Sequence, residues 1–285
     1  MKIREEAFLG LPLSCPIIDA HTHLGPDHAG GWHQKYNRTS TDCVLEDLAR
    51  LGIDCIVTAP HTLTQKRMQE TNLITKAAAA KYPGKVYGYI AVIPWHGLDE
   101  VKRELESYRN DPAFLGIKLL TGIQGSLLQP EYLYALDFAE EMGCPVLCHE
   151  YANIPDRQEF VTALKKRHRM KLLIAHQGGG FATDTRACAP IIRDYENAFM
   201  ELCGSVDNQL TVAQIVDLVG EDKVIFGTDA INLDPKYEIG KVAFSPICDD
   251  VKKKIFAQNY LGLLGDSQMG QITVKSDQEC RFEII

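Results

Sequence analysis

The sequence predicts a (β/α)8 TIM barrel of the α/β class, and two observations carry this prediction. Eight apolar runs of strand length occur along the 285 residues, and the segments between them are long enough for helices. Several runs are apolar almost throughout, which is typical of parallel strands covered on both faces. Eight strands that each precede a helix match this barrel, which needs about 250 residues as one domain.

The predicted strands are the runs at residues 16–23, 54–61, 86–94, 114–121, 145–150, 171–176, 198–204 and 223–229. No hairpin dipeptide joins two of these runs directly. Consecutive strands are therefore expected to be parallel, because each connection is long enough to cross back over the sheet.

Helix signals fill the segments between the runs. The first helix is capped by Thr41 and Asp42, carries its apolar residues on one face and ends at Gly52. The later helices are predicted at residues 65–82, 98–109, 130–142, 154–167, 190–196, 211–219 and 245–264. The remaining long segments, at residues 25–39, 122–129, 177–189 and 230–241, are expected to be loops and contain no motif that identifies a substrate.

A doubly wound open sheet is the alternative architecture. It is disfavoured because no G-x-G-x-x-G follows the first run, where a dinucleotide site would need it. The glycines at 178–180 follow the sixth run and predict a flexible loop, with phosphate binding as the less favoured alternative. We assign residues 1–265 to one barrel domain. Residues 266–285, with a strand-like stretch at 271–275, are assigned to a C-terminal extension on the barrel or on a neighbouring subunit.

Composition excludes several classes of function. The 30 Lys and Arg against 38 Asp and Glu give a net charge of -8, which disfavours a nucleic-acid partner. No stretch approaches the roughly 18 consecutive apolar residues of a membrane span, and the first ten residues do not resemble a secretory signal. The nine cysteines, several of them inside apolar runs, predict reduced thiols that behave as small hydrophobes in a cytoplasmic protein. A small-molecule substrate and a homodimer are the expected partners.

Polar residues stand where several predicted strands end, which is where barrel enzymes build their sites. His21 and His23 close the first run, His149 the fifth, His176 the sixth and Asp229 the eighth. Because strand side chains alternate, His21 and His23 face the same side and can bind one divalent metal ion. His149 would add a nitrogen and Asp229 an oxygen, leaving a coordination position open for solvent, as in catalytic sites.

In order and spacing, these motifs resemble the amidohydrolase superfamily. The resemblance is to the amidohydrolase-related (amidohydrolase 2) family, which includes enzymes like aminocarboxymuconate-semialdehyde decarboxylase. It covers nearly the whole chain and is carried by residues 19–23, 82–85, 116–119 and 227–229 and by the two later strand-end histidines. It implies a metal held by His21, His23, His149 and Asp229. It also implies that His176 orients or polarises the substrate.

The mechanistic hypothesis is hydrolysis of a small amide, lactone or ester by water activated at one divalent ion. Zinc is the first expectation and manganese the second. Asp229 would take the water's proton, and His176 would stabilise the oxyanion. The alternative keeps the site but decarboxylates or hydrates an unsaturated carboxylic acid, and a non-catalytic metal-binding barrel is the second alternative.

Two further residues are candidates for substrate binding. Lys118 is interpreted as a substrate contact or as the partner of Asp19 in an ion pair inside the barrel. A carbamate on Lys118 that bridges two metal ions is the less favoured interpretation. Trp95, just after the third run, is a candidate apolar wall for a ring-bearing substrate or a cover for the core. Many relatives continue the fourth-strand motif with His-Pro, but Leu120 and Thr121 follow here, so a polar contact at the mouth is expected to be missing.

Overall fold

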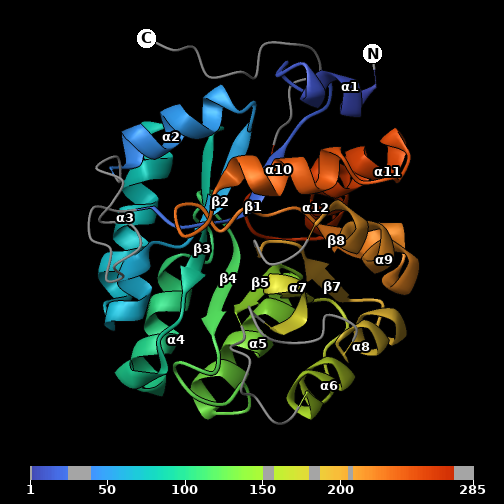
Figure 1. The fold of residues 1–285 in the computed structure, drawn as a ribbon. Helices are drawn as coiled ribbons and strands as arrows, with labels where there is room; N and C mark the ends of the chain where they lie inside the picture. Colours follow the sequence, from blue (N-terminus) through green and yellow to red (C-terminus); the bar gives the residue numbers. More distant parts are fainter. Residues whose placement is uncertain (1, 25–39, 150–156, 180–186, 205–207, 273–285) are drawn as a thin grey trace.

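The computed structural model describes residues 2–24, 40–149, 157–179, 187–204 and 208–272. Eight parallel strands follow one another in chain order around a barrel, and helices surround them (Figure 1). The strands are β1 (Ile18–Thr22), β2 (Cys55–Thr58), β3 (Val86–Ala91), β4 (Phe114–Leu120), β5 (Pro145–His149), β6 (Lys171–Ile174), β7 (Ala198–Glu201) and β8 (Val224–Ile225). Each lies within its predicted run, so the barrel is confirmed and the open sheet is wrong.

The barrel closes between β1 and the residues that follow β8. The backbone nitrogen of Ala20 donates to the carbonyl oxygen of Phe226 at 3.1 Å, and that of Asp229 donates to the carbonyl oxygen of His21 at 2.7 Å. Thr22 then pairs with Ala230 in an isolated parallel bridge. Barrel closure therefore brings two of the predicted site residues together.

Most connecting helices lie where they were predicted, with shifted ends. They are α2 (Thr41–Arg50), α3 (Met68–Lys81), α4 (Leu98–Ser107), α5 (Pro130–Met142), α6 (Gln158–Lys165), α8 (Ala189–Asp194) and α9 (Gln209–Val219). The cap of α2 is Ser40, one residue before the predicted Thr41 and Asp42, and its hydroxyl accepts from the backbone nitrogen of Cys43. The helix predicted at 65–82 begins later, as α3 at Met68, because Lys66 adopts a left-handed φ of 63°. The short 3-10 helix η2 (His61–Gln65) precedes Lys66.

The prediction of a loop at residues 230–241 is wrong for its second half, which begins helix α10 (Pro235–Ala243). The Asp234 side chain caps this helix by accepting from the backbone nitrogen of Lys236 at 2.9 Å. Pro235 occupies the first turn, where its missing N–H costs no hydrogen bond. A second helix without a prediction, α1 (Ile3–Phe8), packs against α10.

The helix predicted at 245–264 is interrupted. It forms α11 (Asp249–Lys253), a π-helical turn η7 (Lys254–Gln258) and α12 (Asn259–Leu264). The carbonyl oxygen of Ile255 in the π-helical turn accepts from the backbone nitrogen of Phe226 at 3.1 Å. Irregular helical hydrogen bonding therefore supports the end of β8 just before the predicted site.

Part of the predicted C-terminal extension packs near the amino ends of the strands. The backbone nitrogen of Gln268 donates to Met142, and that of Gly270 donates to the first residue of β4, Phe114, at 3.0 Å. Residues 271 and 272 form no strand, and the rest of the predicted stretch lies outside the described residues. So do the loop at 25–39 and Gly180 of the glycine run. The first two glycines of that run, together with His176 and Gln177, form the short α7 (His176–Gly179) rather than an open loop.

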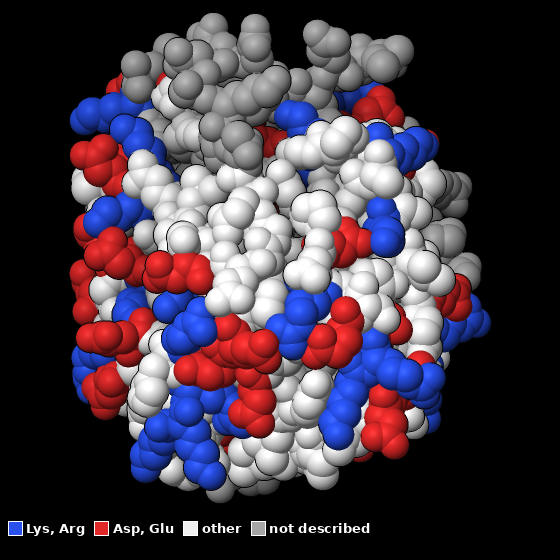
Figure 2. All heavy atoms as spheres, turned by 180° about the vertical axis from the view of Figure 1, so that it is seen from behind, with Lys and Arg blue, Asp and Glu red and all other residues white. Residues whose placement is uncertain are grey.

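The surface and the cysteines agree with the sequence analysis. On the face shown in Figure 2, Lys and Arg are interspersed with Asp and Glu over the lower part of the molecule. Among the described residues, no helix combines the length and apolar character that a membrane crossing needs. All cysteines in that part of the chain are free thiols, and most of them are buried.

Close approach of β4 and β5 requires glycine at position 116. A Cβ atom there would lie 2.2 Å from the carbonyl oxygen of Pro145. We therefore expect Gly116→Ala to lower the free energy of unfolding by about 1 to 3 kcal/mol, because neither backbone can shift without disturbing the barrel. The measurement is chemical denaturation followed by circular dichroism.

Gly262→Ala is the matched control, because its added methyl group would meet no atom within 4 Å. It lies inside α12, where alanine favours the helix by up to about 1 kcal/mol. Equal destabilisation by both substitutions would contradict the steric argument.

Candidate active site

Two histidines of the first strand and one aspartate form the centre of the candidate site. His21 and His23 are buried at the carboxyl end of β1, and their Nε2 atoms lie 3.9 Å and 2.9 Å from Oδ1 of Asp229. One donor atom from each of the three residues falls within 4.8 Å of the others, so they form a group that can hold a metal ion. The structure thus brings together three of the four predicted ligands.

Hydrogen bonds on the far side of both rings direct their Nε2 atoms into the site. Nδ1 of His23 lies 2.6 Å from the carbonyl oxygen of Ala59, and Nδ1 of His21 lies 3.0 Å from Oε2 of Glu201. Carbonyl and carboxylate oxygens only accept, so both Nδ1 atoms carry a proton, and Nε2 is the atom that each ring can offer to a metal ion. The two Nε2 atoms and the Asp229 carboxylate form a donor set that fits a divalent metal.

Asp229 is fixed by its backbone. Its φ of 54° is left-handed, and Asn232 donates from Nδ2 to Oδ1 at 2.9 Å. Burial by itself would raise the pKa of Asp229. The hydrogen bond from His23 and the electrostatic interaction with that ring outweigh burial and hold this pKa well below its usual value. The carboxylate is therefore ionised at neutral pH.

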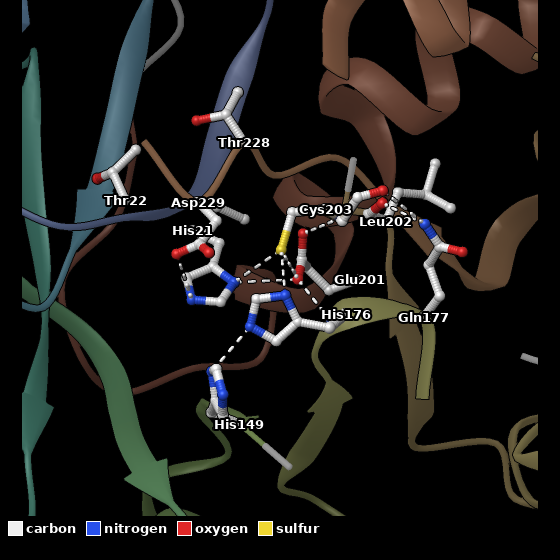
Figure 3. A network of polar contacts seen from close by, with 12 residues as sticks. His21, Thr22, His149, His176, Gln177, Glu201, Leu202, Cys203, Thr228 and Asp229 are labelled. Atoms are coloured by element: carbon white, nitrogen blue, oxygen red, sulfur yellow. Dashed lines mark hydrogen bonds and ion pairs between the residues drawn. The ribbon is translucent and has the colours of Figure 1, made fainter. Parts of the chain in front are cut away.

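His149 and His176 form a second pair beside this group. Nδ1 of His149 lies 2.8 Å from Nε2 of His176, and the ring centroids are 4.3 Å apart (Figure 3). Burial, followed by the charge of the neighbouring imidazole, lowers the pKa of His149 well below its usual value, and burial also lowers that of His176. Both rings are therefore neutral at pH 7. The proposed role of His149 as a metal ligand stays a prediction, because it is not among the three clustered donors.

Lys118 of β4 points into the same site. Its side chain is buried, and Nζ lies 2.7 Å from Nε2 of His21. Burial lowers the pKa of Lys118 to about 8. The predicted ion pair with Asp19 is wrong, because Asp19 accepts from the backbone nitrogen and the hydroxyl of Thr228 at 2.9 Å and 2.5 Å. Both residues lie in the described part of the chain, and no ion pair joins Nζ of Lys118 to the Asp19 carboxylate within 4 Å there.

Trp95 lies apart from this cluster. It belongs to the short helix η3 (Pro94–His96) and is 46% exposed. Nζ of Lys66 lies over its ring, 4.1 Å from the ring centroid. Its predicted role as a substrate wall stays a prediction. Leu120 stands where many relatives have the polar histidine, and Thr121 stands at the position of the following proline. Thr121 is buried and donates to the carbonyl oxygen of His149 at 2.9 Å.

Two residues of the site, Glu201 and Cys203, were not among the predicted site residues. Figure 3 shows both side chains beside His21 and His176. Cys203 was expected to act as a small hydrophobe, but its Sγ lies 3.1 Å from Nδ1 of His176 and 3.0 Å from Oε2 of Glu201. The available signal was an acidic residue in the middle of an otherwise apolar run, residues 198–204.

Comparison with known proteins places this geometry in a family. The family model described as Amidohydrolase matches residues 18–264, which include every strand and the whole candidate site. The chain belongs to the amidohydrolase family. It is therefore a metal-dependent amidohydrolase-superfamily enzyme with a (β/α)8 barrel. No curated protein matches the chain significantly in sequence.

Solved structures share the amidohydrolase fold at low sequence identity. A 2,6-dihydroxybenzoate decarboxylase from Rhizobium is 16% identical, with a TM-score of 0.69 over 88% of this chain and 98% of that one. A 5-carboxyvanillate decarboxylase from Sphingomonas paucimobilis is 13% identical, with a TM-score of 0.69 over 89% and 100%. A dihydroxybenzoic acid decarboxylase from Polaromonas sp. JS666, with bound manganese, is 14% identical, with a TM-score of 0.67 over 88% and 97%.

The clustered donors generate a prediction about metal content. The double variant His21→Ala/His23→Ala should lose the divalent ion, because two of the three grouped donor atoms disappear. The wild type should contain one ion per chain. Plasma mass spectrometry on protein purified without chelator measures both.

His168→Ala is the control, because this histidine is exposed and far along the chain from the cluster. It should keep the wild-type content. An unchanged metal content in the double variant would show that the ion binds elsewhere.

Proposed function

We propose that this amidohydrolase-family enzyme is a metal-dependent decarboxylase of a small aromatic or otherwise unsaturated carboxylic acid. The observation that carries the proposal is the buried ammonium of Lys118 next to the metal-ligating face of His21. The names of the structural neighbours support it, since three of them are decarboxylases of aromatic acids. Decarboxylation was the alternative in the sequence analysis, and these observations favour it over hydrolysis.

The ligands proposed for the ion are His21, His23 and Asp229, with His149 as the fourth. Neutral imidazole nitrogens and one carboxylate suit manganese and zinc alike. Manganese is favoured by the Polaromonas structure, although zinc was the first expectation. A divalent ion held there would act as a Lewis acid toward oxygen atoms of the substrate.

Lys118 is proposed to bind the substrate carboxylate. With a pKa of about 8, its amine is mostly protonated at neutral pH. Nε2 of His21 cannot serve both Lys118 and a metal ion, so in the loaded enzyme the ammonium needs another acceptor. A buried cation without a partner is costly, and a substrate carboxylate would supply the missing negative charge.

Asp229 is proposed to carry the proton. When the bond between the carboxyl group and the substrate carbon breaks, carbon dioxide leaves, and the electron pair stays on the carbon, which must take up a proton. Asp229 is ionised at rest and is held rigidly by its backbone, so it can accept a proton from the substrate's acidic group and return it to that carbon. His176, whose Nε2 faces His149, is proposed to orient the substrate.

Hydrolysis of an amide, lactone or ester would use the same groups and remains an outcome of the test. Purified enzyme loaded with manganese, and separately with zinc, is incubated with hydroxybenzoates and unsaturated carboxylic acids, and then with lactones and amides. Release of carbon dioxide measures decarboxylation, and acid release in a pH-stat measures hydrolysis. Turnover of lactones or amides without carbon dioxide would overturn the proposal.

The role of Asp229 is tested by Asp229→Asn. The amide cannot carry the proton, so kcat should fall by about 10²- to 10⁴-fold for the substrate identified above. Metal content is measured on the same sample, which separates loss of the proton carrier from loss of a ligand. Asp222→Asn, which alters an exposed carboxylate paired with Lys254, should keep wild-type activity. Full activity in Asp229→Asn would refute the assignment.

A further inference from the structure

Glu201 is a buried carboxylate that is partnered by hydrogen-bond donors rather than by a lysine or arginine. It ends β7, and its exposed fraction is 0%. Oε1 accepts from the backbone nitrogen of Cys203 at 2.7 Å. Oε2 accepts from the backbone nitrogen of His176 at 3.2 Å, lies 3.0 Å from Sγ of Cys203 and 3.0 Å from Nδ1 of His21.

A buried carboxylate is energetically unfavourable in a barrel core unless it is well partnered. Removing a carboxylate from water is costly, and an apolar side chain of similar volume usually packs at least as favourably. The glycine at position 227 leaves room for the Glu201 side chain. A Cβ atom on Gly227 would lie 2.2 Å from Oε1 of Glu201 and 2.8 Å from Cβ of His21. The absence of a side chain at 227 therefore lets the carboxylate reach the imidazole.

Contacts on both sides of His21 require the same tautomer. The Glu201 carboxylate accepts at Nδ1, so Nδ1 carries the proton. The Lys118 ammonium only donates, so Nε2, at 2.7 Å from Nζ, must carry a lone pair. The lone pair needed by a metal ion thus faces Asp229 and His23 because Glu201 occupies the opposite side.

The same carboxylate also anchors the turn that presents His176. His176 and Gln177 have left-handed φ values of 52° and 59°, which are unfavourable for residues with side chains. The backbone nitrogen of His176 donates to Oε2 of Glu201, and the side chain of Gln177 donates to the carbonyl oxygen of Leu202 at 3.0 Å. Both hydrogen bonds tie this turn to the end of β7.

We propose that Glu201 is a positioning residue, which holds the tautomer of His21 and the turn of His176 and thereby sets the affinity of the site for its divalent ion. This inference rests on the metal site of the proposed function and not on the reaction. Glu201 acts through the two histidines and touches neither metal nor substrate. No step of the proposed decarboxylation uses it.

The test is metal affinity in Glu201→Gln. The amide keeps the shape of the side chain, but it has no charge and only its oxygen accepts. It therefore cannot hold the His21 proton on Nδ1 and also accept from both of the backbone nitrogens that donate to Glu201. We expect the Kd for Zn²⁺ and for Mn²⁺ to rise by about 10- to 100-fold, as for other residues that orient metal-bound histidines. Competition with a chromogenic chelator on the apo protein measures this without any assay of activity.

Glu238→Gln is the matched control. It also changes a buried carboxylate, which pairs with Lys241 at 2.6 Å, but it lies on α10 and contacts no candidate ligand. It should lower thermal stability and leave the Kd unchanged. Equal weakening of metal binding in both variants, or a wild-type Kd in folded Glu201→Gln, would overturn the proposal.

A second measurement tests the tautomer directly. Long-range ¹H–¹⁵N spectra of histidine in the apo wild type should show the His21 proton on Nδ1, and Glu201→Gln should raise the fraction of rings protonated on Nε2. A wild-type ring protonated on Nε2 would refute the inference even if the variant fails to fold. If the wild type binds neither metal while His21 has the expected tautomer, the metal site of the proposed function fails but the positioning by Glu201 is supported.

Discussion

Closure of the barrel between its first and last strands is the constraint on which the candidate site depends. The carbonyl oxygen of His21 accepts from the backbone nitrogen of Asp229, while the side chains of the same two residues face one another. A main-chain hydrogen bond therefore sets the separation of imidazole and carboxylate. Side chains on mobile loops would vary more in their separation, and metal sites tolerate little displacement of their ligands.

The site also depends on an arrangement of charge around one ring. His21 has a carboxylate on its Nδ1 side and an ammonium and a second carboxylate on its Nε2 side. Burial favours the neutral forms of the histidines, and the neutral form is the one that can ligate a metal. The low-dielectric interior thus prepares the nitrogen ligands, while the carboxylates supply the negative charge that a divalent ion needs.

Much of this fold was predictable because periodicity and position are local properties. Eight apolar runs defined the strands, and the parity of His21 and His23 placed both rings inside the barrel. Asp19 shows the limit of that argument, because parity gives the side of a strand but not the height at which a partner lies. Thr228 lies at the level of Asp19 and donates to it twice, so Lys118 has no access to that carboxylate at ion-pair distance.

Glu201 was missed for a different reason. Its partners come from β1 and from the turn after β6. The acidic residue in the apolar run 198–204 indicates a buried polar site, but it does not indicate which residues Glu201 contacts. Helix α10, by contrast, was signalled by Asp234 and Pro235 as a capping pair and was overlooked, because the whole segment was treated as a mouth loop. The unpredictable part of the site is therefore the part that depends on contacts between distant strands.

The buried Lys241 of α10 links two walls of the mouth. Its Nζ donates to the carbonyl oxygens of Leu202 and Gly204, at 2.8 Å and 3.1 Å, just beyond β7. The segment after β8 thus holds the segment after β7 in place. In a lineage that acquires new substrates, changes to this one helix would reshape both walls together, whereas the barrel beneath them could stay as it is.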